Sequence, residues 1–423
     1  MGTILLLLPF STKAGHISFV DALFTSTSAV CVTGLIVQDT ATYFTTGGQV
    51  VIMALFQLGG LGIMAFSTLI LLVAGKKISI QDRLVIQQGY HYTSAQNVKS
   101  LIKNIFIYTL LIEGAGTLLL FLYWHKKFPG IKGFLHSIFH AISAFCNAGF
   151  SLFSDSFMSF RGDTFVNVTI MLLIVLGGLG FLVLKEGREI FFYRLKKGRI
   201  KISLHSKMIF VITFLLIAVP FLYFLFFEWD KSLMGYSLKE KVLASLFQVI
   251  TARTAGFNTM DLNTLSFSAI FLLIFLMFVG ASPGSTGGGI KTSTFGVIFA
   301  FMKSRMAARD SVNIFRRTLP IQIVMRAFTV VTLSMGVIFL SSFILFLTQP
   351  TMAMKNVFFE VFSAFGTVGL SLGITPKLNE AGKIVIILSM YVGRIGPLTL
   401  LYAFSREKSF GKFEYVEESI MIG

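Results

Sequence analysis

Four stretches of similar sequence decide the fold of this chain: Ser28–Leu35 (SAVCVTGL), Ser143–Phe150 (SAFCNAGF), Thr251–Phe257 (TARTAGF) and Ser363–Leu370 (SAFGTVGL). Each stretch carries a glycine at the same place, and the aligned glycines are Gly34, Gly149, Gly256 and Gly369. These glycines recur at intervals of about 110 residues, which indicates one structural unit used four times. One such string could arise by chance in a glycine-rich membrane helix, but four strings in the same context do not.

A short amphipathic segment precedes each string, and long apolar runs flank it. The short segments have roughly 10–13 residues, too few to cross a bilayer, so we expect them to be buried or re-entrant. They are Phe19–Val30, Gly133–Phe145, Glu240–Ala252 and Asn356–Phe365. The long runs are Gly2–Phe10 and Gly48–Val73, Leu101–Tyr123 and Phe165–Leu184, Met208–Phe227 and Phe267–Val279 continued by Phe295–Met302, and Ala327–Leu347 and Ile384–Phe404. The pattern predicts an all-α polytopic membrane protein, with four tandem helix–pore-helix–helix repeats arranged in parallel, pseudo-fourfold symmetry around one pore.

The composition of the 423 residues agrees with a membrane protein, because 55% are hydrophobic and only 13% are charged. Soluble domains carry about 25% charged residues. The mean hydropathy of +0.81 also excludes a disordered chain. A net charge of +17 would suggest nucleic acid as a partner in a soluble protein. In a membrane protein basic residues collect in cytoplasmic loops, so we expect the lipid bilayer as a partner and no nucleic acid.

Basic segments between the apolar blocks set the expected topology: Lys76–Lys103, Lys185–Lys207, Lys303–Arg317 and Arg406–Lys412. The positive-inside rule makes these segments and the C-terminus cytoplasmic. The expected units are residues 1–74, 75–184, 185–303 and 304–405, followed by a cytoplasmic tail at 406–423. The first unit opens with half a span, so we expect the start of its first helix to be missing.

The four glycine strings predict a ring of extended strands whose backbone carbonyls face a common axis. Such carbonyls replace the hydration shell of a potassium ion, and the short helices point their partly negative C-terminal ends toward the same place. Glycine permits the positive φ angles that this arrangement needs. No Asp or Glu ring lies in the strings, which argues against a calcium filter. The predicted filter residues are Val32, Thr33, Gly34, Leu35, Asn147, Ala148, Gly149, Phe150, Thr254, Ala255, Gly256, Phe257, Thr367, Val368, Gly369 and Leu370. We expect Arg253 to point away from the ion.

A glycine-rich stretch at residues 280–290 (GASPGSTGGGI) interrupts the last long run of the third unit. Glycine and proline at this density make a continuous helix unfavourable. The stretch could be a plain connection between two helices, or a loop beneath the filter that acts as a gate. A phosphate-binding loop does not fit, because the strand–GxxxxGK[ST]–helix context is missing. The predicted gating residues are Ser282, Gly284, Ser285, Thr286, Gly287, Gly288, Gly289 and Arg394, where Arg394 contacts loop carbonyls or forms an electrostatic barrier.

The four strings, GASPGSTGGGIK at 280–291 and YVGRIGPLT at 391–399 resemble the Trk/Ktr/HKT superfamily of potassium transporters over residues 1–410. The likeness is greatest to the membrane subunit of bacterial Ktr systems. It implies potassium uptake across the bacterial cytoplasmic membrane, often with sodium as activator, and no cofactor in this chain. It also implies a homodimer on a cytosolic ring of nucleotide-binding regulatory subunits, which are separate chains. By the same likeness Ser282–Ile290 is the intramembrane gating loop and Arg394 helps to close it. Glycine at all four filter positions is the pattern associated with potassium preference.

Two other classes of function were weighed against a gated pore. A secondary transporter that moves another solute by alternating access would suit inverted repeats, but the charge pattern predicts parallel ones. An intramembrane enzyme would need a polar catalytic set within the spans, and the sequence offers none. We therefore expect no enzymatic activity, and we keep the secondary transporter as the alternative.

Overall fold

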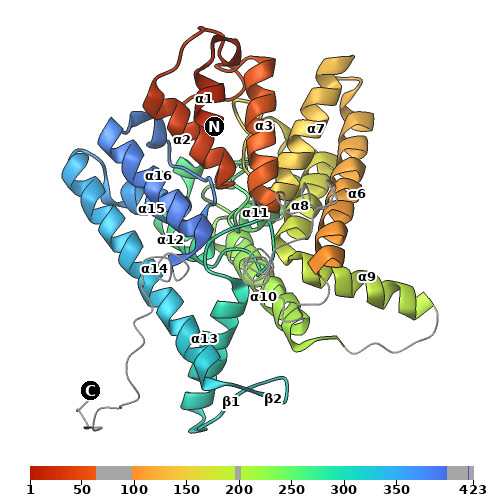
Figure 1. The fold of residues 1–423 in the computed structure, drawn as a ribbon, viewed down its shortest axis with the longest axis vertical. Helices are drawn as coiled ribbons and strands as arrows, with labels where there is room; N and C mark the ends of the chain where they lie inside the picture. The colour runs from red at the N-terminus through yellow and green to blue at the C-terminus, as the bar shows by residue number, and fades with distance from the viewer. Residues whose placement is uncertain (63–97, 196–201, 398–417, 419–423) are drawn as a thin grey trace.

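The computed structural model describes residues 1–62, 98–195, 202–397 and 418, and these residues are mainly helical (Figure 1). The α-helices are α1 (Gly2–Leu7), α2 (Phe19–Val30), α3 (Thr46–Leu61), α6 (Val98–Trp124), α7 (Ile131–Cys146), α8 (Thr164–Leu179), α9 (Phe181–Leu195), α10 (Leu204–Phe227), α11 (Leu238–Thr251), α12 (Phe267–Phe278), α13 (Thr292–Met306), α14 (Ile321–Thr348), α15 (Met354–Gly366) and α16 (Glu380–Ile395). Short 3-10 helices lie at Pro9–Ser11, Met158–Phe160, Leu262–Thr264 and Thr375–Lys377. Strands β1 (Val312–Ile314) and β2 (Arg317–Leu319) pair as an antiparallel hairpin beyond the end of α13.

The short helices α2, α7, α11 and α15 confirm the four pore helices that the sequence predicts, with ends within two residues of the expected ones. Their starts are capped where the sequence provides a suitable residue. The Ser18 side chain accepts from the Asp21 N–H at the start of α2. A complete capping box joins Ser237 and Glu240 at the start of α11. Because a cap satisfies N–H groups that the helix leaves unpaired, these caps fix where α2 and α11 begin.

The packing of the helices follows a closed cycle. The last helix of each unit contacts the pore helix of the next: α3 packs on α7, α8 on α11, α12 on α15, and α16 returns to α2. An ion pair strengthens the last of these contacts, since Lys383 Nζ of α16 lies 2.6 Å from Asp21 Oδ1 of α2. The arrangement confirms an all-α polytopic fold with a ring of four units. The residue boundaries between the units stay a prediction.

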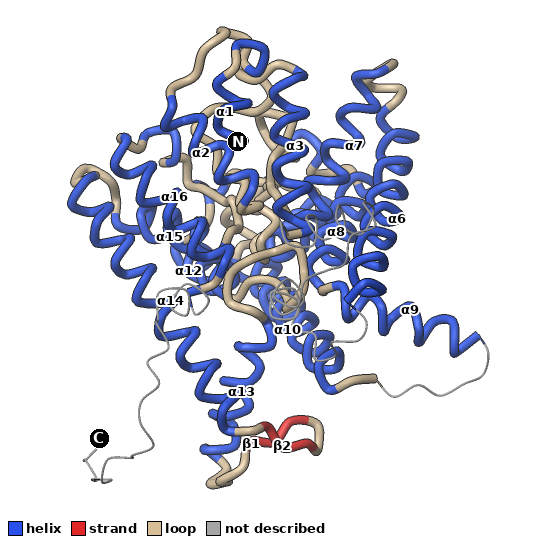
Figure 2. Tube along the Cα trace, viewed as in Figure 1, coloured by secondary structure: helices blue, strands red, loops and turns tan. Residues whose placement is uncertain are grey.

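The centre of the ring is occupied by irregular backbone. In Figure 2 the loop segments converge in the middle of the molecule, surrounded by helices. The central residues are nevertheless buried: Val32, Ala148, Ala255 and Val368 have no exposed surface. Irregular backbone at membrane depth is tolerated only where protein or a water-filled cavity surrounds it. The helices therefore enclose a stretch of irregular backbone that could line a pathway.

The last apolar run of the second unit is broken, although the sequence predicts a continuous run, whereas the interruption between α12 and α13 in the third unit is the predicted one. Among the described residues three helices are long and apolar enough to cross a membrane, namely α6, α10 and α14, and a fourth span arises if α8 and α9 count as one. The axis bends by 104° between α8 and α9 instead of continuing through Phe165–Leu184. Gly180, with φ of 93°, stands at this bend. Gly62 and Gly396 follow the ends of α3 and α16 with similar φ angles of 83° and 92°. Such angles cannot continue an α-helix.

Several predicted segments lie outside the described residues. They are the end of the first unit after residue 62, most of the basic segment at 76–103, part of that at 185–207, the end of the last apolar run after residue 397, and the tail at 406–423 apart from Glu418. The basic segment at 303–317 is described, and it contains the turn of the β-hairpin, where Phe315 and Arg316 have positive φ.

Candidate functional site

The four aligned glycines form a closed ring at the centre of the molecule. A Cβ placed on Gly34 would lie 2.5 Å from the Ala148 carbonyl oxygen and 2.9 Å from the Gly149 Cα. A Cβ on each of the other glycines would likewise approach the carbonyl oxygen of the residue before the next glycine. These distances are 2.9 Å from Gly149 to Ala255, 2.3 Å from Gly256 to Val368, and 2.1 Å from Gly369 to Thr33. No side chain fits at any of these positions without a shift of the neighbouring backbone. Glycine is thus required by close approach of four strands.

Each strand also has the same unusual backbone conformation. The glycines have φ between 72° and 94°. The residue two positions before each glycine is left-handed too, with φ of 57° at Val32, 57° at Asn147, 78° at Thr254 and 50° at Thr367. A positive φ is rare for residues other than glycine and is a genuine outlier for β-branched ones. Strain of this kind persists only where the surroundings enforce it, and it concentrates at functional sites.

Serines near the ends of the pore helices hold three of the four strands. The Ser28 carbonyl accepts from Thr33 N at 2.8 Å, and its Oγ accepts from Gly34 N at 3.1 Å. Ser363 repeats both bonds in the fourth unit, to Val368 N at 2.8 Å and Gly369 N at 3.1 Å. Our sequence analysis missed these positioning residues. The signal was present, because a serine stands six positions before the glycine in three of the four strings, the third being Ser143.

The stretch at 280–290 packs directly against these strands. The Gly288 N–H donates to Thr367 Oγ1 at 3.1 Å. The Thr286 hydroxyl donates to the Phe145 carbonyl at the end of α7, at 2.9 Å. A Cβ on Gly287 would lie 2.2 Å from Thr254 Oγ1. The loop therefore touches the second, third and fourth units at the level of the strands, which a simple connection between α12 and α13 would not need to do.

The remaining loop residues are held by backbone contacts with the broken helix of the second unit. Ser282 N donates to the Gly178 carbonyl at 3.0 Å, and Phe181 N donates to the Gly284 carbonyl at 2.9 Å. The Ser285 hydroxyl donates to the Ser282 carbonyl at 2.6 Å. Gly289 ends the loop with φ of 67°, and Ile290 forms a parallel bridge with Val279. The loop thus closes on itself while docking on the break between α8 and α9.

Two basic side chains clamp the loop. Arg394 of α16 donates from Nη1 to the Thr286 carbonyl and from Nη2 to the Gly59 carbonyl of α3. Lys291 Nζ donates to the Gly287 carbonyl at 2.8 Å. A charged group within a membrane is costly unless it is paired or bound to backbone carbonyls. Arg394 contacts a loop carbonyl in this structure, and its role in gating stays a prediction.

Two other buried polar residues of the pore helices hold the segments that follow the strands. His140 of α7 accepts from the Leu152 N–H at 3.2 Å and is hydrogen-bonded to Ser151 Oγ at 3.1 Å. Glu360 of α15 accepts from the Ser371 hydroxyl at 2.7 Å. Both side chains are fully buried and brace the segment after a strand. Within the described ranges no group of His, Cys, Asp and Glu side chains could hold a metal ion.

Comparison with known proteins shows which family the chain is similar to. Residues 2–414 match the family TrkH, described as a cation transport protein. The chain is 40% identical to the Ktr system potassium uptake protein B of Bacillus subtilis (strain 168), covering all of this chain and 94% of that protein. It is 38% identical to the potassium/sodium uptake protein NtpJ of Enterococcus hirae, with the same coverage of 100% and 94%. The crystal structure of the potassium transporter TrkH from Vibrio parahaemolyticus has a TM-score of 0.72 at 23% identity, covering 92% of this chain and 79% of that one. The last match is a likeness of fold.

Proposed function

This chain belongs to the TrkH family of cation transport proteins, and from that premise we propose that it takes up potassium through a carbonyl-lined filter gated by an intramembrane loop. The observation that carries the proposal is the closed ring of Gly34, Gly149, Gly256 and Gly369 at the centre of the fold. A ring of backbone dipoles can replace the hydration shell of potassium. The names of the relatives, potassium uptake protein B and potassium/sodium uptake protein NtpJ, support the same cation.

The filter proposed here comprises the four residues of each strand from two positions before the glycine to one after it. Alternation of left-handed residues within these strands supports a backbone that can turn its carbonyls to one side. The ends of α2, α7, α11 and α15 lead directly into the strands. Since the C-terminal end of a helix carries about half a negative charge, four such ends favour a cation at the centre.

The gate proposed here is the loop from Ser282 to Gly289, with Arg394 as its latch. Contacts of the loop with Phe145, Thr254 and Thr367 support a position across the pathway. Opening would require the loop to release the carbonyl bonds that Arg394 and Lys291 make to it. Glycine at three successive positions (287–289) gives the backbone freedom for such a movement.

The setting proposed for the protein follows from its relatives and its charge. We propose a bacterial cytoplasmic membrane, a cytoplasmic C-terminus, a homodimer, and a separate cytosolic ring of nucleotide-binding regulatory subunits. Sodium is proposed as an activator, which the name of the Enterococcus hirae relative supports. The helix contacts form a ring of four units, whereas a transporter that works by alternating access is commonly built from two inverted halves. The fold therefore does not support alternating access.

Uptake of rubidium into proteoliposomes tests the proposal. Rubidium is a tracer for potassium because the two ions have similar size and charge. The purified protein should load vesicles with rubidium along an imposed gradient, and excess potassium should compete while choline should not. Folded protein that admits no rubidium, even with regulatory subunits supplied, would contradict the proposed function.

A further inference from the structure

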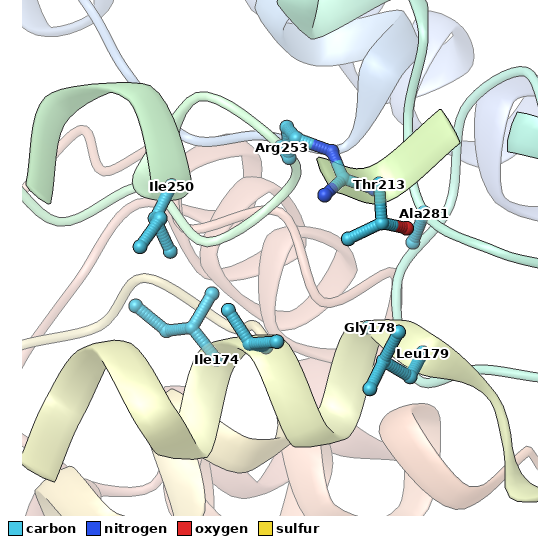
Figure 3. A pocket seen from close by; sticks show the side chains of 8 residues that line it. Ile174, Gly178, Leu179, Thr213, Ile250, Arg253 and Ala281 are labelled. Carbon is cyan, nitrogen blue, oxygen red and sulfur yellow. The ribbon is translucent and has the colours of Figure 1, made fainter. Parts of the chain in front are cut away.

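A small cavity lies between α8, α10 and α11, beside the start of the third filter strand (Figure 3). It has a volume of about 10 Å³, near the smallest volume that holds one water-sized guest. Ile174, Leu179 and Ile250 contribute apolar side chains to its wall. Two polar side chains complete the lining (Figure 3): Thr213 from the middle of α10, and Arg253, two residues after the end of α11.

Arg253 Nε and Thr213 Oγ1 both lack a hydrogen-bond partner among the described residues. Arg253 is 8% exposed and Thr213 is 7% exposed. The two atoms themselves are buried. A buried cation without a counter-charge is strongly unfavourable, and a buried hydroxyl without a partner adds to the cost. A bound group that accepts hydrogen bonds from both atoms and carries negative charge would remove this cost.

The neighbouring quadrant of the ring shows how the same position is filled elsewhere. Between α3, α6 and α7, the Glu113 carboxylate accepts from Gln57 Nε2 at 3.0 Å. The Cys146 thiol lies 3.2 Å from Gln57 Oε1 and 3.7 Å from Glu113 Oε1. Glu113 is 5% exposed. A negative or acidic oxygen group thus occupies this place between the first and second units.

The two places correspond through the repeat. Cys146 and Arg253 both stand three positions before their filter glycines. Glu113 and Thr213 both lie about three turns before a buried aromatic residue near the end of their helices, Trp124 and Phe224 respectively. Where the second unit supplies a thiol and a carboxylate, the third supplies a guanidinium and a hydroxyl. The third unit therefore has a cation here, and no Asp or Glu is among the described residues that line the cavity.

We propose that this cavity binds one monoatomic anion, chloride in the cell, between the Arg253 guanidinium and the Thr213 hydroxyl. The anion takes the place of the missing carboxylate and satisfies both donors. Water would accept the hydrogen bonds but would leave the guanidinium charge uncompensated. Because Arg253 adjoins Thr254 of the filter, the anion also cancels a positive charge that would repel a cation in the pathway. The site does not depend on which cation the protein carries.

Bromide diffraction tests the site directly, since bromide replaces chloride and scatters anomalously. Crystals of the full chain grown in bromide should show an anomalous peak between Arg253 Nε and Thr213 Oγ1. Density without anomalous signal at that place would mean a water molecule and would overturn the proposal. An empty cavity would overturn it equally.

Thermal unfolding in matched bromide and gluconate, at one ionic strength, provides a second measurement. A ligand that binds only the folded state raises Tm, so bromide should raise the wild-type value by about 2–4 °C. Thr213→Glu supplies the carboxylate internally, and Arg253→Met removes the charge, so both should abolish the bromide effect. Arg305→Met is the matched control, because Arg305 lies at the end of α13 with its side chain half exposed, and it should keep the effect. An equal bromide effect in all four proteins would overturn the proposal.

Discussion

Substitution of Gly34 by serine would push a side chain into the ring of glycines. Gly34 has φ of 87°, and a Cβ there would lie 2.5 Å from the Ala148 carbonyl oxygen. Ordinary contacts between such atoms begin at about 3.5 Å, so the second strand must retreat by about 1 Å. The neighbouring contact, 2.9 Å to the Gly149 Cα, requires about 0.6 Å of movement of the same strand. Backbone rather than a flexible side chain has to move, and that backbone carries the carbonyls of the proposed filter.

The expected size of the effect follows from two contributions. A residue other than glycine in the left-handed region costs about 1–2 kcal/mol. Displaced carbonyls also coordinate potassium less well, while sodium, which needs a narrower cage, loses less. A difference of about 1.4 kcal/mol between the two ions corresponds to a tenfold change in their ratio. We therefore expect Gly34→Ser to lower the preference for potassium over sodium about tenfold.

Paired rubidium and sodium influx into proteoliposomes measures this ratio. Gly15→Ser is the matched control, because Gly15 has φ of 73° but no atom within 4 Å of its added Cβ. It carries the same backbone strain without any contact to the ring, so its ion ratio should equal that of the wild type. If Gly34→Ser were folded and kept the wild-type ratio, Gly34 would not line the filter and the reasoning would fail.

Three further predictions concern the loop and the closure of the ring. Deleting part of Gly284–Gly289 should raise rubidium influx, because the obstruction is shortened; unchanged or lower influx in a folded protein would argue against a gate. Arg394→Gln should also raise influx, since it weakens charge-assisted bonds to backbone carbonyls worth about 1.5–3 kcal/mol each; a loss of influx with normal folding would speak against a latch. Asp21→Asn should lower the free energy of unfolding by about 2 kcal/mol in thermal or denaturant unfolding, because it weakens the 2.6 Å pair with Lys383 that closes the ring. Glu189→Gln, in an exposed pair 3.9 Å long, should change that stability by less than about 0.5 kcal/mol, and equal effects of the two would refute the closure.

The pore helices were predictable because residues next to their ends indicate where they begin and end. Ser18 and Ser237 mark where two of them begin, and the repeated glycine strings mark where all four end. Amphipathic spacing and a length too short to cross the bilayer completed the prediction. The interruption at 280–290 was equally predictable, because three consecutive glycines follow a proline within a few residues.

The ends of α3 and α16 and the break between α8 and α9 were not predicted, although a signal was present. GGLG occurs at 59–62 and again at 177–180, and GRIG follows at 393–396. The first glycine of each string meets a carbonyl at the end of a pore helix, as Gly59 does with Val30, where a Cβ would lie 1.9 Å from the oxygen. An apolar run with a few glycines reads as one continuous span, because hydropathy does not record which positions need close approach or a positive φ.

The side-chain hydrogen bonds that position the strands could not be predicted from the sequence, for a different reason. Ser28 and Ser363 are ordinary helix residues by composition, and their role depends on the strand folding back over them. Arg253 shows the same limit. From the sequence we expected it to point away from the ion. In the structure it lines a cavity together with Thr213, and nothing in the string TARTAGF indicates that the described residues offer its Nε no partner.

Anomalous diffraction from crystals grown in rubidium tests the central claim most directly, because it locates the cation itself. The account predicts a peak on the axis enclosed by Gly34, Gly149, Gly256 and Gly369, within coordination distance of the carbonyls of Thr33, Ala148, Ala255 and Val368. Excess potassium should remove the peak. Rubidium bound elsewhere, with none on this axis in a protein that carries rubidium across vesicles, would contradict it.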